Sequence, residues 1–184
     1  GFRINASADD ATGLGVQEQF RNQTIRINQS IRNARDSLSL LQMAHTAMAE
    51  QIVILQQMRE LVAQTSEGTL ADPDREAVQD EIEALNRELE RISMSTPFDG
   101  KRLSDGNLNV SVATGAGPND RITINIGGTR PQDLGLSSDA RVSTEMILKT
   151  PKKVDDAIEK VATKQSVLVK SARALFDTYK KEES

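Results

Sequence analysis

Acidic side chains are the most clustered of the residues in this chain that could do chemistry. Five of them lie within eleven residues: Asp80, Glu81, Glu83, Glu88 and Glu90. Carboxylate oxygens at such density could bind a divalent cation. Because Arg87 and Arg91 are interspersed among them at helical spacing, a solvated helix face of mixed charge is the better interpretation. We therefore expect no metal site here, and no other pattern predicts a cofactor.

Two polar residues interrupt an otherwise apolar helical pattern, His45 and Arg59. His45 is the single histidine of the chain, which has no cysteine. Since metal and catalytic sites need clustered partners, a structural role is favoured over a proton switch or a metal ligand. Arg59 has two interpretations of equal weight. Either it pairs with a carboxylate of a neighbouring helix, or it marks where the apolar face of the helix is accessible to a binding partner.

The chain has one pair of adjacent glycines, Gly127 and Gly128, followed by Thr129. Such a stretch could be compared with a phosphate-binding loop. The lysine and the following helix that such a loop requires are missing. No other pattern predicts a concave pocket. The sequence therefore predicts a protein that is not an enzyme.

Composition excludes several other classes of function. Charged residues make up 27% of the 184 residues, with a net charge of −4, so a nucleic-acid partner and a polybasic membrane contact are not expected. No stretch approaches the roughly 20 apolar residues that span a bilayer, so no membrane insertion is predicted. The first residues also lack the pattern of a cleaved signal peptide. Aromatic residues are only 3% of the chain, which favours aliphatic helix–helix contacts over a compact aromatic core.

A long helix is predicted for residues 11–67, after an irregular lead-in over residues 1–10. Apolar residues recur there at alternating steps of three and four, which is typical of a coiled-coil-like helix. The predicted positions are Ile27, Ile31, Ala34, Leu38, Leu41, His45, Met48, Ile52, Leu55, Arg59 and Val62. A helix of this length spans roughly 80 Å at 1.5 Å per residue, so the molecule should be a rod.

Gly68 and Pro73 predict a break and then a second helix over residues 73–95, antiparallel to the first. Its apolar positions are Ala77, Val78, Ile82, Leu85, Leu89 and Ile92. Residues 96–141 are expected to hold a β-hairpin and loops, because Leu108, Val110 and Val112 alternate with polar residues, as do Ile122, Ile124 and Ile126.

A return helix is predicted over residues 143–184, capped or kinked by Pro151. Its apolar positions are Met146, Ile147, Val154, Ile158, Val161, Leu168, Leu175 and Phe176. The expected fold is mainly α: one elongated domain over residues 1–184, in which three long helices form a bundle with one β-hairpin.

Four stretches of the chain, in order, resemble the bacterial flagellins: GFRINASADDATGL, LQQMRELVAQTSEGT, DREAVQDEIEALNRELERIS with FDGKRL, and VDDAIEKVATKQSVL. Together they cover most of residues 1–168. The tail after Leu168, VKSARALFDTYKKEES, departs from the family pattern but is compatible with a helix.

The resemblance implies the inner rod domain of a filament subunit, without the terminal polymerising segments and the variable outer domains. A fragment of this kind is expected to be monomeric. In the flagellum the implied partners are other flagellin subunits, and the implied location is extracellular, reached by the flagellar export route without a cleaved signal peptide. Because loops and edges at the ends of a rod are free to meet neighbours, subunit contacts are expected from the hairpin and from the Arg3–Thr12 segment. The candidates within that segment are Arg3, Ile4, Asn5, Asp9 and Asp10.

The resemblance also implies an innate immune partner, the Toll-like receptor that senses flagellin. Matching positions for a receptor-facing surface are Arg59, Glu60, Leu61 and Glu81. Gln57 stands where the family has a key arginine, and glutamine lacks the charged, forked donor of arginine. We therefore expect weak receptor activation.

Two other functions remain open on the sequence. A hook–filament junction protein shares flagellin-like terminal motifs, although not usually so much of the RELVAQTSEGT region. A coiled-coil signalling module also has long heptads, but such modules rarely place a β-hairpin before the return helix.

Overall fold

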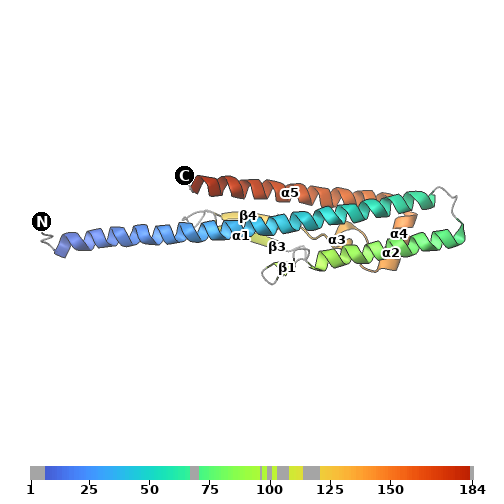
Figure 1. Cartoon of the computed structure of the whole chain (residues 1–184), viewed down its shortest axis with the longest axis horizontal. Coiled ribbons are helices and arrows are strands. Elements are labelled where there is room, and N and C mark those ends of the chain that lie inside the picture. Colours follow the sequence, from blue (N-terminus) through green and yellow to red (C-terminus); the bar gives the residue numbers. More distant parts are fainter. Residues whose placement is uncertain are drawn as a thin grey trace.

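The computed structural model describes residues 7–66, 71–95, 97–98, 101–102, 108–113 and 121–182. Its elements in chain order are α1 (Ser7–Ser66), α2 (Asp72–Ser95), β1 (Pro97–Phe98), β2 (Lys101–Arg102), β3 (Leu108–Ala113), β4 (Arg121–Ile126), α3 (Pro131–Leu134), α4 (Ala140–Lys149) and α5 (Lys152–Glu182). They form an elongated body with α1 along its length (Figure 1). The predicted fold class, a mainly α bundle of long helices with a β-hairpin, is confirmed.

α1 begins at Ser7 and not at residue 11, so the helix extends further toward the N-terminus than the sequence predicted. Asp9 and Asp10, assigned to an irregular lead-in, have a helical backbone close to the N-terminus of α1. Acidic residues there suit the positive end of the helix dipole. With 60 residues, α1 spans about 90 Å.

The buried face of α1 corrects the predicted heptad. The residues that are buried at alternating steps of four and three are Ser30, Ala34, Ser37, Leu41, Ala44, Met48, Gln51, Leu55, Met58 and Val62. Five of the eleven predicted positions belong to this set, but His45 and Arg59 are exposed and their preceding residues, Ala44 and Met58, are buried. Small and polar residues fill core positions where the helices approach closely, and hydrophobicity alone does not reveal such positions.

α2 runs back alongside α1, as the antiparallel prediction required (Figure 1). Its buried residues are Val78, Ile82, Asn86, Leu89, Ile92 and Ser93. Leu85 is half-buried, whereas Ala77, predicted to be apolar core, is exposed. Ala77 precedes Val78, which occupies the core position of that turn.

The predicted return helix is divided into α4 and α5 at Pro151. Proline lacks a backbone N–H and cannot continue the helical ladder, and Thr150 closes α4 with a 3.0 Å bond from its N–H to the carbonyl of Met146. α4 packs mainly on α2, and α5 packs along α1. Phe176 was predicted in the core, but it is 53% exposed because Leu175 takes the buried position.

The hairpin pairs the predicted apolar residues across its two strands. Val110 lies opposite Ile124 and Val112 lies opposite Ile122 in antiparallel register. β3 contacts α1 and β4 contacts α5, and Val112 and Ile124 are buried there. A second, minimal pair, β1 with β2, and the short α3 lie in the region that was expected to hold one hairpin and loops.

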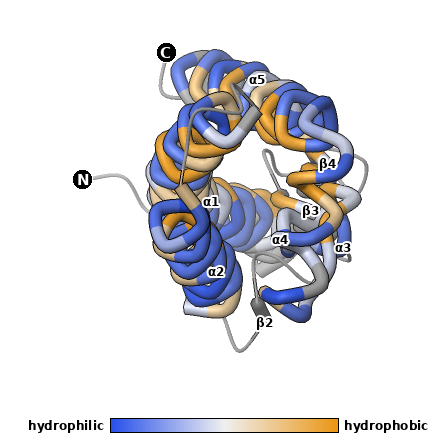
Figure 2. Tube along the Cα trace, turned by 90° about the vertical axis from the view of Figure 1, so that its right-hand side faces the viewer, coloured by the Kyte–Doolittle hydropathy of each residue, from blue (hydrophilic) through white to orange (hydrophobic). Residues whose placement is uncertain are grey.

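α1 contains a stretch that is apolar and long enough to cross a bilayer by composition, between Gly15 and Thr65. This corrects the expectation that no such stretch exists. One face of the stretch packs against α5, α2, α4 and β3, which lie on one side of α1 in the end view (Figure 2). Its exposed large apolar residues are Val16, Phe20, Ile25, Met43 and Val53. The buried face of the stretch is the core face of a bundle helix.

Candidate interaction surfaces of the rod

A layer of buried polar side chains joins α1, α2 and the segment after β4. It favours one position of these elements along the axis of the rod. The Gln51 side-chain N–H donates to the Ser93 hydroxyl at 2.8 Å and to the Thr129 carbonyl at 3.3 Å. Asn86 of α2 donates to the Ser143 hydroxyl of α4 at 2.6 Å. Because buried polar groups are costly without partners, these bonds favour one helix register.

Two lysines on α5, one turn apart, attach the segment after β4 to the rod. The ammonium of Lys160 donates to the Leu134 carbonyl at 2.9 Å, and that of Lys164 donates to the Gly128 carbonyl. Burial lowers the pKa of Lys164, and the nearby Lys160 charge lowers it further, while Asp133 opposes the shift. A Cβ at Gly127 would lie 3.3 Å from Cε of Lys164, so the segment lies close to α5.

The predicted receptor-facing residues lie on α1 and α2, which pack against each other. Gln57, Arg59, Glu60 and Glu81 are exposed, and Leu61 is half-buried. Arg59 approaches Asp155 of α5 at 3.8 Å, with both side chains more than half exposed. Of the two interpretations of Arg59, the structure thus shows the ion pair, which at this exposure contributes about 0–1 kcal/mol.

The predicted subunit-contact residues lie mostly beyond what the structure describes. Arg3, Ile4 and Asn5 fall outside the described residues. Asp9 and Asp10 belong to α1, but their side chains are outside the described part of the chain. Their contacts with other subunits stay a prediction.

Two acidic residues of the α2 cluster, Glu83 and Glu88, are paired with arginines on the same helix. Glu88 accepts two hydrogen bonds from Arg91, at 2.6 and 2.7 Å, and this contact lowers the pKa of the Glu88 carboxyl. Glu83 and Arg87 lie 3.5 Å apart. Within the described ranges, no group of three His, Asp or Glu side chains is arranged to hold a metal ion.

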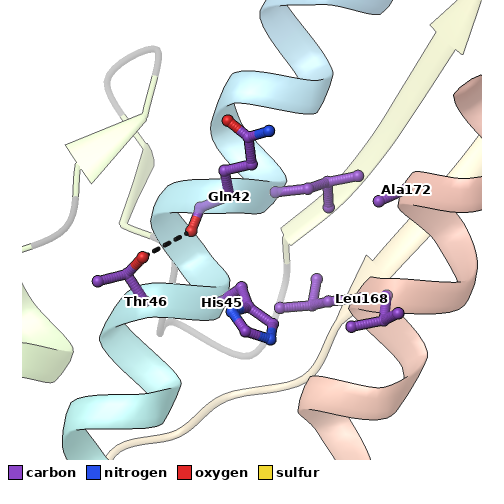
Figure 3. A pocket seen from close by; sticks show the side chains of 7 residues that line it. Gln42, His45, Thr46, Leu168 and Ala172 are labelled. Atoms are coloured by element: carbon purple, nitrogen blue, oxygen red, sulfur yellow. Dashed lines mark hydrogen bonds between the residues drawn. The ribbon is translucent and has the colours of Figure 1, made fainter.

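His45 lies at a notch between α1 and α5 rather than in the core (Figure 3). The notch is lined by Leu41, Gln42, His45, Thr46, Leu168, Val169 and Ala172. Gln165 of α5 donates to the His45 carbonyl at 3.4 Å, so these two residues lie at the same level of the rod. The sequence analysis did not predict this surface. The signal that could have revealed it is the spacing of Val169, Ala172 and Phe176, which places them on one face of the helix beside the core.

These features define an elongated helical rod with extended side surfaces and a notch between two helices. The family model for the bacterial flagellin N-terminal helical region matches residues 1–109. The chain therefore belongs to the bacterial flagellin family.

Individual relatives agree with this assignment. Flagellin B of Vibrio anguillarum is 34% identical over 145 residues, which cover 78% of this chain and 39% of the relative. The flagellin of Bacillus subtilis strain 168 is 38% identical over 139 residues, covering 74% of this chain and 45% of the relative. The chain thus matches less than half the length of these relatives.

A solved structure shows the same fold. The crystal structure of Bacillus cereus flagellin superposes with a TM-score of 0.70 at 24% identity, covering 82% of this chain and 88% of that one. At that identity the likeness supports the architecture of α1, α2, the hairpin and α5, and it carries no statement about individual surface residues.

Proposed function

We propose that this chain forms part of a structural subunit of the bacterial flagellar filament and serves motility through subunit packing. The observation that carries the proposal is the rod itself, with α1 about 90 Å long, in a chain that belongs to the flagellin family. A rod offers long side surfaces to neighbouring copies. The proposed partners are other flagellin subunits, the proposed location is the extracellular filament, and the proposed role involves no catalysis.

The chain is proposed to act as one elongated unit over residues 1–184. The polar layer around Gln51 and the lysine ties of α5 support this, because each joins elements distant in the sequence. Small-angle X-ray scattering of dispersed protein should give a longest dimension of at least roughly 90 Å. A compact particle with a radius of gyration near ~16 Å would contradict it.

Deletion of the gene tests the filament role directly. Cells without the protein should lose filaments or assemble fewer of them, and sheared wild-type filaments should contain the chain as a bulk component. Normal filaments that lack the chain would overturn the proposal. A hook–filament junction protein would instead be present in few copies per filament. A signalling module would be absent from the sheared material.

The N-terminal end of α1 is proposed to contribute to subunit contacts. The double change Asp9→Ala and Asp10→Ala in the full-length protein should impair filament formation. The exposed change Gln64→Ala on the same helix should not. Normal filaments from the double variant would remove these residues from the interface.

A weak ligand role toward the flagellin-sensing Toll-like receptor is proposed for the surface with Gln57, Arg59, Glu60, Leu61 and Glu81. Exposure of four of these side chains supports it, and the neutral Gln57 accounts for the weakness. Gln57→Arg should raise potency in receptor reporter cells, whereas Gln64→Arg should not. Full potency of the unmodified protein would contradict the proposed weakness.

A further inference from the structure

Charge is distributed unevenly along the rod. We define the basic half as residues 15–36 of α1 and 165–180 of α5, which contain seven basic and three acidic residues, a net charge of +4. The first half of α2, residues 72–83, contains six acidic residues and one basic residue, a net charge of −5. Opposite charge on two separate surfaces of a rod favours contact between copies.

The α5 part of the basic half forms an exposed face beside the notch, whose α1 side lies outside the basic half, at residues 41–46. On α5 its side chains follow one helix stripe at steps of four, three and four: Val169, Arg173, Phe176 and Lys180. Val169 lines the notch and is 51% exposed, and Phe176 is 53% exposed. On α1 the notch is lined by Gln42 and His45. An apolar centre with a charged rim is the usual anatomy of a protein interface.

The acidic surface lies on a different side of the molecule. α2 and α5 flank α1 on separate sides in the end view (Figure 2). Within α2 the exposed residues Glu76 and Asp80 lie one turn apart, beside exposed Ala77 and Ala84. Small side chains between the carboxylates let the helix approach an opposing surface closely.

We propose that the notch face of α1 and α5 binds the first half of α2 of a second copy, in a lateral contact between rods. This inference rests on the proposed filament function and names the surface through which neighbouring subunits meet. Lys170 and Arg173 would oppose Glu76 and Asp80 in α2 of the second copy. Val169 and Phe176 would be covered by its small side chains.

The contact requires a stagger between the two rods. Gln165 lies level with His45, and Ser93 lies level with Gln51. Counting along the antiparallel helices places Arg173 near residue 37 of α1 and Asp80 near residue 64. The neighbouring rod is therefore displaced by roughly 40 Å along its axis, at 1.5 Å per residue.

Packing without a stagger lacks this complementarity. By the same count the first half of α2 lies beyond the start of α5. The part of α5 beside the second half of α2, residues 152–164, has a net charge of only +1. Two of its four lysines, Lys160 and Lys164, already donate to carbonyl groups of the same chain. The positive charge available to a neighbour lies instead at the other end of α5.

Zero-length carbodiimide cross-linking of filaments sheared from cells tests the contact. The expected products join Lys170 to Glu76 or Asp80. Within one copy these residues are roughly 40 Å apart along the rod, so each such product must join two copies. Dispersed subunits are the control and should give none of these products.

Charge reversal tests the same contact energetically. In the full-length subunit, Glu76→Lys with Asp80→Lys, or Lys170→Glu with Arg173→Glu, should each raise the critical concentration for polymerisation about tenfold. All four changes together should restore it. Lys152→Glu with Lys153→Glu, at the other end of α5, is the matched control and should leave it unchanged. Circular dichroism of the dispersed variants checks that each one folds.

The outcomes separate this inference from the filament role. Wild-type filaments without the expected cross-links, with cross-links from Lys170 to other carboxylates, or with no rescue in the fourfold variant would overturn the lateral contact alone. Sheared filaments that do not contain the chain would overturn the filament role itself.

Discussion

The side chain of Gln51 in α1 donates a 2.8 Å hydrogen bond to the hydroxyl of Ser93 in α2, and both residues are almost fully buried. The Gln51 side chain also reaches the Thr129 carbonyl at 3.3 Å. One polar side chain in an apolar seam thus joins the two antiparallel helices to the segment that follows the hairpin. A glutamine at a core position of a heptad can in this way fix the register of the bundle.

Gln51→Ala should destabilise the fold by about 2–4 kcal/mol, because it removes two buried hydrogen bonds and leaves a cavity. Urea unfolding followed by circular dichroism measures the loss. Gln57→Ala on the exposed side of α1 is the matched control and should change stability by less than about 0.5 kcal/mol. Equal effects of the two changes would mean that Gln51 does not hold the register.

Leu168→Ala should cost about 2–5 kcal/mol of folding free energy, since Leu168 is 1% exposed at the contact of α5 with α1. Phe176→Ala on the same helix should cost far less, because more than half of that side chain is exposed. Thermal unfolding of both variants makes the comparison. A larger loss for Phe176→Ala would show that α5 is rotated relative to the observed packing.

Gly135→Ala should destabilise the fold by about 1 kcal/mol or more. Gly135 ends α3 with a φ of +91°, which strains any side chain, and a Cβ there would lie 3.1 Å from the Lys160 ammonium. Gly15→Ala should instead stabilise α1 by up to about 1 kcal/mol, because Gly15 lies within a helix and its Cβ would meet open space. Unfolding curves of the two variants should show a loss of stability for Gly135→Ala and a gain of stability for Gly15→Ala.

Lys164 should make stability rise with pH on the alkaline side. Its pKa in the folded chain lies below the usual 10.5, so between those two values the unfolded chain binds more protons than the folded one. Stability therefore increases as pH rises through that window, and the slope vanishes above the unfolded pKa. Partial exposure of the ammonium keeps the effect small.

Lys164→Met should remove that contribution, which urea midpoints measured at a series of alkaline pH values would show as a flatter profile. Lys152→Met, at an exposed position near the start of α5, is the control and should leave the profile unchanged. A wild-type profile identical to that of Lys164→Met would contradict the burial of the ammonium.

The strongly periodic elements could be predicted from the sequence. α1, α2 and the hairpin were predicted, and Val110 and Val112 indeed pair with Ile124 and Ile122. Alternation and heptad spacing are local signals that report which face is buried. The same signals placed Leu41, Met48 and Leu55 in the core of α1 correctly.

The errors in α1 arise from core side chains that are small or polar. Ala44 and Gln51 are buried because a neighbouring helix approaches them, whereas the pattern favoured His45 and Ile52 one residue later. The choice between Leu175 and Phe176 likewise depends on the rotation of α5, which adjacent apolar residues do not specify. The notch was missed because it forms only when residues 41–46 meet residues 168–172.

The position of the protein along the flagellum tests the central claim most directly. The chain has no cysteine, so Ser138→Cys in the exposed bend before α4 provides a single site for a fluorescent maleimide. A filament subunit predicts continuous fluorescence along every filament of living cells, with none in unsubstituted cells. A single focus at the base, or filaments without label, would contradict the claim that the chain builds the filament.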